Sequence, residues 1–307
     1  EYSNQGLMHR LLETALKKMR ERGQYISYLF PYSIPYYRRK GWEIVSNKIT
    51  YEISDYQLPK NHQVSGSVKR VKYDSDEIKE TYNKFAMHTN GAILRDELAW
   101  NEYWLWDPDD MMAAVYYNKD GEPDGYIIYW ISEEVFHIKD MIFNNEEART
   151  GLWNFVSAHF SMIDKVEGHT YTDEKLSFLL EDSSIKEVVS PYYMARIVDF
   201  VEFIKDYKFK KSDIETRSWK FVLTDPILEE NQGTFNLIID KNGKAHAEKI
   251  EEHCDDEISI QTMTTMLMGY KRPEYLYKIG RINADKEIVE MLENSIAQDV
   301  PYISDYF

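Results

Sequence analysis

The stretch YISYLFPYSIPYYRRKGW, residues 25–42, encodes a strand, a short helix and a turn into a second strand. The apolar and aromatic run 25–30 predicts a buried strand, which ends at a proline that lacks a backbone N–H donor. Residues 35–39 predict a short helix. Gly41 predicts a turn before a long strand over 42–53. This order of elements is typical of a mixed α/β sheet with flanking helices.

The segment before this stretch predicts an amphipathic helix. Apolar residues at positions 7, 8, 11, 12, 15, 16 and 19 recur at helical spacing, and Gly23 follows as a helix stop. Such a helix needs a sheet to cover its apolar face. We therefore expect the chain to begin inside a domain, with the first strands of that domain lying before Glu1.

The rest of the chain continues the α/β pattern. A Pro- and Gly-containing segment, residues 57–67, predicts a linker. Beyond it we expect helices at 74–88, 96–106, 146–160, 198–205, 260–268 and 285–296, and strands at 111–117, 125–131, 135–143, 219–224, 233–240 and 244–250. The turn residues Lys241-Asn242-Gly243 predict a hairpin. The fold class is α/β (α+β), with mixed sheets in two units followed by an α+β domain.

Composition narrows the classes of partner. The 307 residues carry a net charge of −16 at a sequence pI near 5.0, which argues against nucleic acid as a partner and is compatible with cationic ligands. The alternative is that the acidity only aids solubility. No apolar run approaches the roughly 20 residues of a membrane span, so no membrane partner is expected. The one cysteine, Cys254, excludes an intramolecular disulfide and fits a reducing, cytoplasmic location.

Both ends of the chain carry candidate chemistry. Gly6 precedes the first helix, where free N–H groups and the helix dipole suit a phosphate. At the other end, residues 300–307, VPYISDYF, are half aromatic, unlike the polar tails of most chains. Docking of this tail would bury the carboxylate of Phe307, a candidate general base. A glycine needed only for a turn and an ordered but inert tail are the alternatives.

Several short sequence motifs occur in a specific order. They are ALKKMRERG (residues 15–23), LFPYS (29–33), YYRRKGW (36–42), GYIIY (125–129), ARTGLWNF (148–155) and MARIVD (194–199). This series resembles the second half of a GCN5-related N-acetyltransferase (GNAT) domain followed by further domains. It is most similar to the Eis (enhanced intracellular survival) type, and the resemblance covers essentially the whole chain.

The resemblance implies a three-part protein. Residues 1–60 would be the C-terminal half of a catalytic GNAT domain, 61–195 a second GNAT-like domain, and 196–307 a sterol-carrier-protein-like domain with a catalytic C-terminus. Members transfer acetyl from acetyl-CoA to amines, so the expected substrate is a cationic small molecule, such as an aminoglycoside or polyamine, or a lysine side chain. Members also assemble as hexamers, so a homo-oligomer is expected.

The resemblance also implies site residues. The acetyl-CoA diphosphate would sit on Asn4, Gln5, Gly6, Leu7 and Met8, and no metal is needed. Tyr37 maps to the general acid, with a core tyrosine as its alternative and Tyr36 as the neighbour to exclude. The carboxylate of Phe307 maps to the general base. Ser3 stands where the family usually has arginine, so binding of the diphosphate would depend on backbone amides.

These two groups suit direct transfer. A terminal carboxylate has a pKa of about 3.5, too low for an efficient base at neutral pH, and burial among aromatic side chains would raise it. A phenol, with a pKa of about 10, can protonate the leaving thiolate. Asp299 and Asp305 are candidates to attract a cationic amine, with solvated surface charge as the alternative.

Two other interpretations stay open. Met263, Met266 and Leu267 could line a tunnel, which would make the chain a lipid- or apolar-ligand-binding module with a vestigial transferase; core packing is the alternative. The middle domain could instead serve assembly. A group of tryptophans such as Trp100, Trp104 and Trp106 more often belongs to a hydrophobic core than to a ligand-binding cage. The segment His253-Cys254-Asp255-Asp256 does not have the ligand spacing of a zinc site, and it predicts a surface loop.

Overall fold

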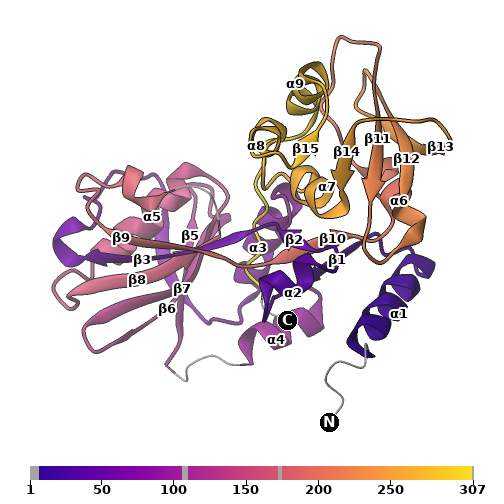
Figure 1. Cartoon of the computed structure of the whole chain (residues 1–307). Coiled ribbons are helices and arrows are strands. Elements are labelled where there is room, and N and C mark those ends of the chain that lie inside the picture. Colours follow the sequence, from indigo (N-terminus) through magenta and orange to yellow (C-terminus); the bar gives the residue numbers. More distant parts are fainter. Residues whose placement is uncertain (1–6, 106–109, 172–174, 306–307) are drawn as a thin grey trace. The chain divides into compact units, whose positions relative to one another are not determined.

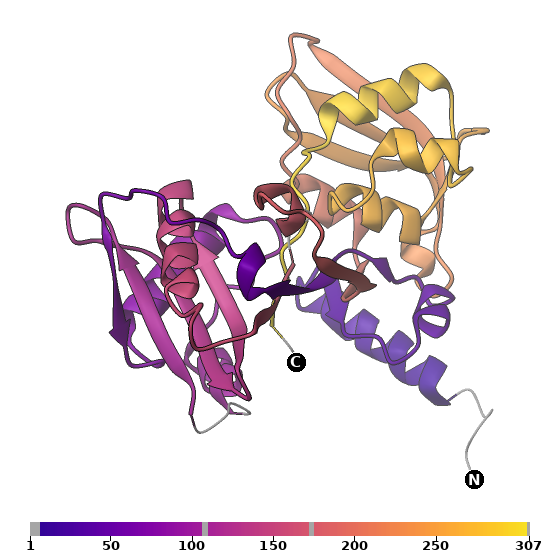
Figure 2. The same cartoon turned by 90° about the vertical axis from the view of Figure 1, so that its left-hand side faces the viewer.

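The computed structural model describes residues 7–105, 110–171 and 175–305. The chain forms two compact units (Figures 1 and 2). The first unit combines residues 1–46 with 192–300, and the second combines 47–191 with a short segment that begins at Pro301. Both are built from mixed sheets with flanking helices, so the expected α/β fold class is confirmed.

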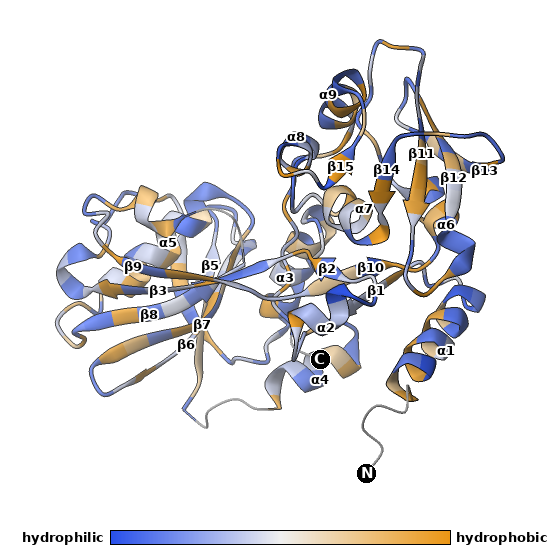
Figure 3. Ribbon diagram, in the orientation of Figure 1, coloured by the Kyte–Doolittle hydropathy of each residue, from blue (hydrophilic) through white to orange (hydrophobic). Residues whose placement is uncertain are grey.

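A small antiparallel sheet in the first unit joins residues far apart in sequence. Its strand order is β1-β10-β2, with β1 at Ile26–Leu29, β10 at Met194–Ile197 and β2 at Glu43–Ile44. Helix α1 (Leu7–Glu21) packs Leu16 into the core beside it, and α2 (Ile34–Arg38) is the predicted short helix. Figure 3 shows hydrophilic and hydrophobic residues side by side along α1, as an amphipathic helix requires.

The prediction of one long strand over 42–53 is wrong. The segment divides into β2 and β3 (Asn47–Ser54), which belong to different sheets. Between them Val45 and Ser46 are fully buried, and the amide of Val45 donates to the carbonyl of Tyr193 at 3.0 Å. Burial therefore continues through the break between the two strands. For this reason the periodicity of the sequence does not reveal the break.

Arg196 on β10 organises the loops of the first unit. Its guanidinium is fully buried and donates to both oxygens of Asp225 at 2.6 and 2.5 Å. Asp225 also accepts from the amides of Ile227 and Leu228, each at 2.9 Å. Arg196 donates as well to the carbonyl of Lys40, just before Gly41. A buried charge is stable only when it is paired and hydrogen-bonded in this way.

The remainder of the first unit is a five-stranded sheet with four helices. The strand order is β13-β12-β11-β14-β15. The elements are β11 (Thr216–Thr224), β12 (Gly233–Asp240), β13 (Ala245–Ile250), β14 (Glu257–Ser259), β15 (Ile282–Asn283), α6 (Phe200–Asp206), α7 (Ile260–Leu267), α8 (Pro273–Lys278), α9 (Lys286–Ser295) and the 3-10 turn Glu229–Asn231. The β12–β13 hairpin is confirmed. Met263 and Met266 are fully buried with Trp219 in the hydrophobic core formed by this sheet and its helices.

The second unit is a seven-stranded sheet with helices against its faces. The strand order is β4-β5-β6-β7-β8-β3-β9. The elements are β4 (Ser67–Val71), β5 (Met112–Tyr117), β6 (Pro123–Ser132), β7 (Val135–Phe143), β8 (Lys165–Thr170), β9 (Lys186–Pro191), α3 (Asp76–His88), α4 (Glu97–Trp104), α5 (Glu146–Ser157) and the 3-10 turns Asp55–Gln57 and Leu176–Leu179. Helix α5 packs on β5, β6 and β7 around Leu152 and Val156.

Strands β7 and β8 form the parallel pair of this sheet, and they pair over a short length. The register joins 135–137 to 165–167, although β7 continues to Phe143 and β8 to Thr170. All the other neighbouring pairs between described strands of this sheet are antiparallel. Beyond position 137 the two strands no longer share a hydrogen-bond ladder, so the sheet can admit other side chains there.

The contact between Gly41 and Arg196 generates a stability prediction. Gly41 has φ +96°, and a Cβ there would lie 2.2 Å from a guanidinium nitrogen of Arg196. Because Gly41→Ala would strain the turn and disturb a buried ion pair, we expect a loss of about 3 kcal/mol in the free energy of unfolding, measured by urea titration.

Gly280→Ala is the matched control in the same unit. Gly280 has φ +72° with nothing within 4 Å of the added carbon, so only backbone strain of about 1 kcal/mol applies. Equal losses in the two variants would contradict the role given to Arg196.

Candidate functional site

Tyr37 lies in a group of aromatic side chains on and beside α2. Its ring centroid is 5.5 Å from that of Tyr32, 5.3 Å from Tyr36 and 6.0 Å from Trp42, each in an edge-to-face arrangement. Trp42 is buried in the core below, whereas Tyr32 is 72% exposed. Tyr37 is therefore held from beneath by the core and remains partly open to solvent, as a group that meets a substrate must be.

The backbone and a buried carboxylate fix the end of α2. The carbonyl of Tyr37 accepts from the amides of Lys40 at 2.8 Å and Trp42 at 3.2 Å, which closes the turn at Gly41. Glu43 accepts from Arg38 at 2.6 Å and from Arg281 at 2.8 Å. Burial alone would raise the pKa of Glu43, but hydrogen bonds from Arg38, the Ile44 amide and Arg281 hold it below its usual value. Glu43 thus stays ionised and braces α2.

The hydroxyl of Tyr37 stays protonated at neutral pH. Burial raises its pKa, and the neighbouring hydroxyls of Tyr32 and Tyr36 raise it further. A protonated phenol can donate to a developing anion but cannot act as a base. Burial also raises the pKa of Tyr36, so the direction of the shift does not distinguish the two tyrosines.

Only part of the predicted cofactor turn is described. Leu7 and Met8 open α1 and are about half exposed, at 50% and 52%. The first turn of α1 has no acidic residue, and Nζ of Lys40 lies 3.0 Å from Nδ1 of His9 in that region. Within the described residues, the first turn of α1 thus presents no carboxylate that would repel an anion. Asn4, Gln5 and Gly6 lie outside the described residues, as does Phe307.

The C-terminal tail segment, defined as residues 301–305, is docked in the second unit. The amide of Tyr302 donates to the carbonyl of Asn90 at 2.8 Å, and its ring meets Phe85 at 4.9 Å and Tyr171 at 5.6 Å. Burial raises the pKa of Tyr302 well above that of a free phenol. Ile303 is 1% exposed. The expectation that the aromatic tail docks is confirmed for these residues.

Asp305 does not serve as free surface charge. It is buried and accepts from Nε of Arg95 at 2.6 Å, so its charge is committed to an internal partner. The suggestion that Asp305 attracts a cationic substrate is therefore wrong, because the cation that it binds belongs to the chain. No local sequence pattern indicates this pairing, because the two residues are 210 positions apart.

Three aromatic rings enclose the guanidinium of Arg95. Its central carbon is 3.8 Å from the ring of Tyr82, 4.6 Å from Trp100 and 3.9 Å from Tyr103. We call these three residues the aromatic cage. Each face-on contact with a desolvated cation is favourable. Trp100 was expected to be a core residue and is one, but it also forms part of a cage for an internal cation. Trp106 lies outside the described residues.

A buried carboxylate, Asp140, extends this network. It accepts from the hydroxyls of Tyr103 at 2.9 Å and Tyr126 at 2.8 Å. Burial raises the pKa of Asp140, while nearby Arg95 and the two phenols oppose that rise. Sequence reasoning missed Asp140, because it occupies an ordinary position in a strand. A negative group in a predicted apolar strand was the one available signal.

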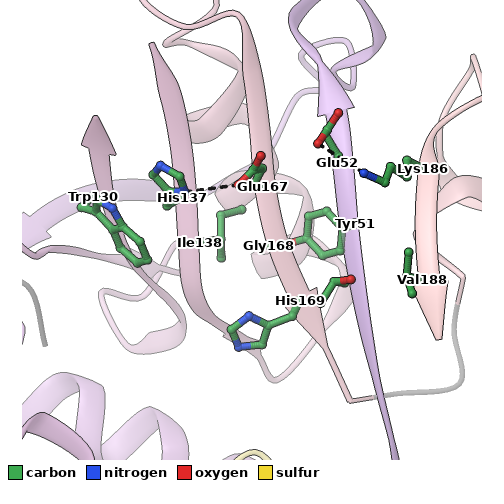
Figure 4. Close-up of a pocket in the computed structure, with 11 residues that line it drawn as sticks. Tyr51, Glu52, Trp130, His137, Ile138, Glu167, Gly168, His169, Lys186 and Val188 are labelled. Atoms are coloured by element: carbon green, nitrogen blue, oxygen red, sulfur yellow. Dashed lines mark ion pairs between the residues drawn. The ribbon is translucent and has the colours of Figure 1, made fainter. Parts of the chain in front are cut away.

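A separate pocket of about 360 Å³ lies over β6, β7, β8, β3 and β9 (Figure 4). Its ionisable side chains lie near one another: His137 is 3.6 Å from Glu167, and Lys186 is 4.0 Å from Glu52. His169 also lines it, and burial, followed by the charges of Lys48 and Lys139, lowers its pKa to about 4. Ionisable side chains and apolar residues such as Trp130 thus line this pocket together.

Comparison with known families assigns the segments of the chain. Residues 1–45 and 91–197 match the acetyltransferase (GNAT) domain, and residues 200–304 match the sterol carrier protein domain. The chain thus contains GNAT acetyltransferase domains and a sterol carrier protein domain. Among the described residues, no helix is both long and apolar enough to cross a membrane.

Individual relatives agree with this class. An uncharacterized N-acetyltransferase of Streptomyces griseus is 22% identical over 217 residues, covering 62% of this chain and 51% of the relative. The chain therefore spans about half the length of the curated relatives that it matches. A conserved Enterococcus faecalis protein of unknown function, described as a probable N-acyltransferase, is 27% identical with a TM-score of 0.91, covering 100% of this chain and 78% of that one.

A second solved structure, Eis1 from Mycobacterium abscessus, shares the fold. It is 16% identical with a TM-score of 0.81, covering 99% of this chain and 79% of that chain. The mixed α/β fold thus recurs in proteins that have diverged widely in sequence. At this identity the likeness concerns the fold alone.

The depressed pKa of His169 generates a prediction about pH. An unfolded histidine titrates near pH 6.5 and the folded one near 4, so below about pH 6.5 the unfolded chain takes up a proton that the folded chain refuses. Stability should therefore fall as the pH falls. This group alone should cost about 2 kcal/mol between about pH 7.5 and pH 5.

The measurement compares urea unfolding of the wild-type chain and His169→Gln over that pH range. The variant should lose the part of the pH dependence that His169 supplies. Parallel stability curves for the two chains would show that His169 titrates normally in the folded protein.

Proposed function

We propose that the protein is an acetyl-CoA-dependent N-acetyltransferase that moves the acetyl group directly to an amine. The observation that carries this proposal is the match of residues 1–45 and 91–197 to the acetyltransferase (GNAT) domain. The fold likeness to a probable N-acyltransferase and the packing of Tyr37, on α2, against Trp42 support it.

In this proposal Tyr37 is the general acid and the carboxylate of Phe307, taken as the last residue of the protein, is the general base. The amine attacks the thioester carbonyl and gives its proton to the carboxylate. The C–S bond breaks, and the CoA thiolate takes a proton from Tyr37. The raised pKa of Tyr37 supports its role, because the phenol must carry its proton until the sulfur becomes basic.

Acetyl-CoA would bind at the start of α1. Asn4, Gln5, Gly6, Leu7 and Met8 would offer backbone amides to the diphosphate, aided by the helix dipole. The described first turn of α1 contains no acidic residue, and Lys40 lies beside His9. Both features support this assignment, because no carboxylate in that turn would repel the diphosphate. No metal takes part in this scheme.

The substrate class and the assembly extend the Eis-type resemblance. We propose a cationic amine, aminoglycoside-, polyamine- or lysine-like, as the acceptor, because the chain carries a net charge of −16. The functional parts would divide near residues 60 and 195. A homo-oligomer, possibly a hexamer, and a cytoplasmic location complete the proposal.

Binding of an apolar ligand by the last third is the second candidate. The sterol carrier protein match over residues 200–304 favours it. The residues first suggested as a tunnel lining, Met263, Met266 and Leu267, are instead packed in the hydrophobic core. The transferase function therefore has the stronger support.

The role of Tyr37 has a direct test. Tyr37→Phe should lower kcat by about 10²-fold, since it removes a proton donor, and leave the KM for acetyl-CoA nearly unchanged. Steady-state acetylation of a polyamine or aminoglycoside panel measures both constants. Tyr36→Phe, one residue away with a similar phenol, is the matched control and should keep most of its activity. Equal effects in the two variants would remove the assignment.

The role of the terminal carboxylate is tested by removing Phe307 from the whole protein. Because the shortened chain ends one residue earlier, its carboxylate cannot occupy the same place. We expect kcat to fall by about 10²-fold or more while acetyl-CoA binding, measured by calorimetry, is retained. Wild-type turnover in this variant would exclude the carboxylate as the base.

A further inference from the structure

The tail segment is attached to the second unit by contacts of two kinds. Pro301, Tyr302 and Ile303 supply apolar and aromatic burial. Asp305 supplies a directional ion pair, and its second oxygen lies 3.4 Å from the hydroxyl of Tyr82. Apolar contacts hold a segment against a surface, whereas a charge-assisted hydrogen bond is directional and also restrains the rotation of the segment.

The environment of Arg95 favours an anionic partner. Its side chain is 0% exposed, and the aromatic cage covers the guanidinium. A cation removed from water needs an anion, and among the described residues Asp305 is the carboxylate that Arg95 contacts directly. Asp140 is nearby but is bound to the phenols of Tyr103 and Tyr126. The site thus selects a carboxylate presented by the tail segment.

Tyr302 lies near the ends of β7 and β8, beyond the residues that pair. It lines a small cavity of about 60 Å³ together with Met141 and Phe143 from the end of β7 and His169 and Thr170 from the end of β8. Tyr302 is 6% exposed. A side chain of the tail segment is thus buried beside the ends of the two parallel strands.

The anchor lies close to the end of the chain. Phe307 follows Asp305 by two positions, and two extended residues span at most about 7 Å. A fixed Asp305 therefore limits how far from it a carboxylate at position 307 can lie. A carboxylate must lie within hydrogen-bond reach of a proton to abstract it, so such confinement matters for rate.

We propose that Arg95, acting through Asp305, is a positioning residue for the terminal carboxylate. The second unit, with a GNAT-domain match of its own, then serves the reaction as the holder of the base. This inference rests on the proposed function for its effect on rate. The anchoring itself is measurable without catalysis.

The experiment uses the whole protein and two readouts. Asp305→Asn keeps the shape of the side chain and removes its charge, so Arg95 loses its anionic partner. The first readout is the rate at which carboxypeptidase A releases Phe307 and Tyr306 from the native protein, followed by mass spectrometry. The second is the kcat for acetylation and the KM for acetyl-CoA, measured separately.

Glu181→Gln is the matched control. Glu181 pairs with Lys60 in the same unit, but both side chains are exposed, at 77% and 76%, so the same acid-to-amide change should affect neither readout. Arg95→Lys keeps the positive charge and loses the planar fork, and it should fall between wild type and Asp305→Asn. Circular dichroism melting confirms that each variant is folded, and Asp305→Asn carries the test if Arg95→Lys is not.

We expect Asp305→Asn to speed release of Phe307 at least about tenfold and to lower kcat by about 10²-fold with the KM for acetyl-CoA unchanged. Release at the wild-type rate would overturn the proposed anchor. Faster release with wild-type kcat, in a protein that is inactivated by removal of Phe307, would overturn the positioning role and leave the proposed function standing. Full activity without Phe307 would instead remove the proposed base.

Discussion

A guanidinium group buried away from water is stable only when an anion pairs with it. Each unit of this protein contains a buried arginine that is paired in this way. Arg196 and Arg95 both have side chains that are 0% exposed. Each is paired with an aspartate from another segment, 29 positions away for Arg196 and 210 for Arg95. Breaking such a pair typically costs about 3–5 kcal/mol, because an unpaired buried charge remains. The loops and the tail that carry these aspartates therefore have strongly specified positions.

The two pairs connect stability to the proposed chemistry. Arg196 donates to the carbonyl of Lys40 and requires a glycine at position 41, and that turn is closed by hydrogen bonds to the carbonyl of Tyr37. Arg95 holds Asp305 near the end of the chain. One arginine thus supports the segment of the proposed acid, and the other supports the segment of the proposed base. Neither arginine contacts the reaction itself in this account.

The sequence allowed the periodic elements to be predicted but not the long-range pairings. Helices such as α3 and α5 and the β12–β13 hairpin were predicted within a few residues, because periodicity and turn chemistry are local. Strand β9 was missed, because it is a largely exposed edge strand with little alternation. The pairing of Arg95 with Asp305 depends on contacts across 210 residues, which no local pattern records. The docking of the tail was predictable from its aromatic content.

The most direct test of the account is a crystal structure of the whole protein with CoA and a bound amine, in which the distance from the Phe307 carboxylate to the amine nitrogen is measured. A distance of about 3 Å, or a single bridging water, with the Tyr37 hydroxyl at hydrogen-bond distance from the sulfur, is the expected result. A carboxylate too far from the nitrogen for one water to bridge would contradict the account.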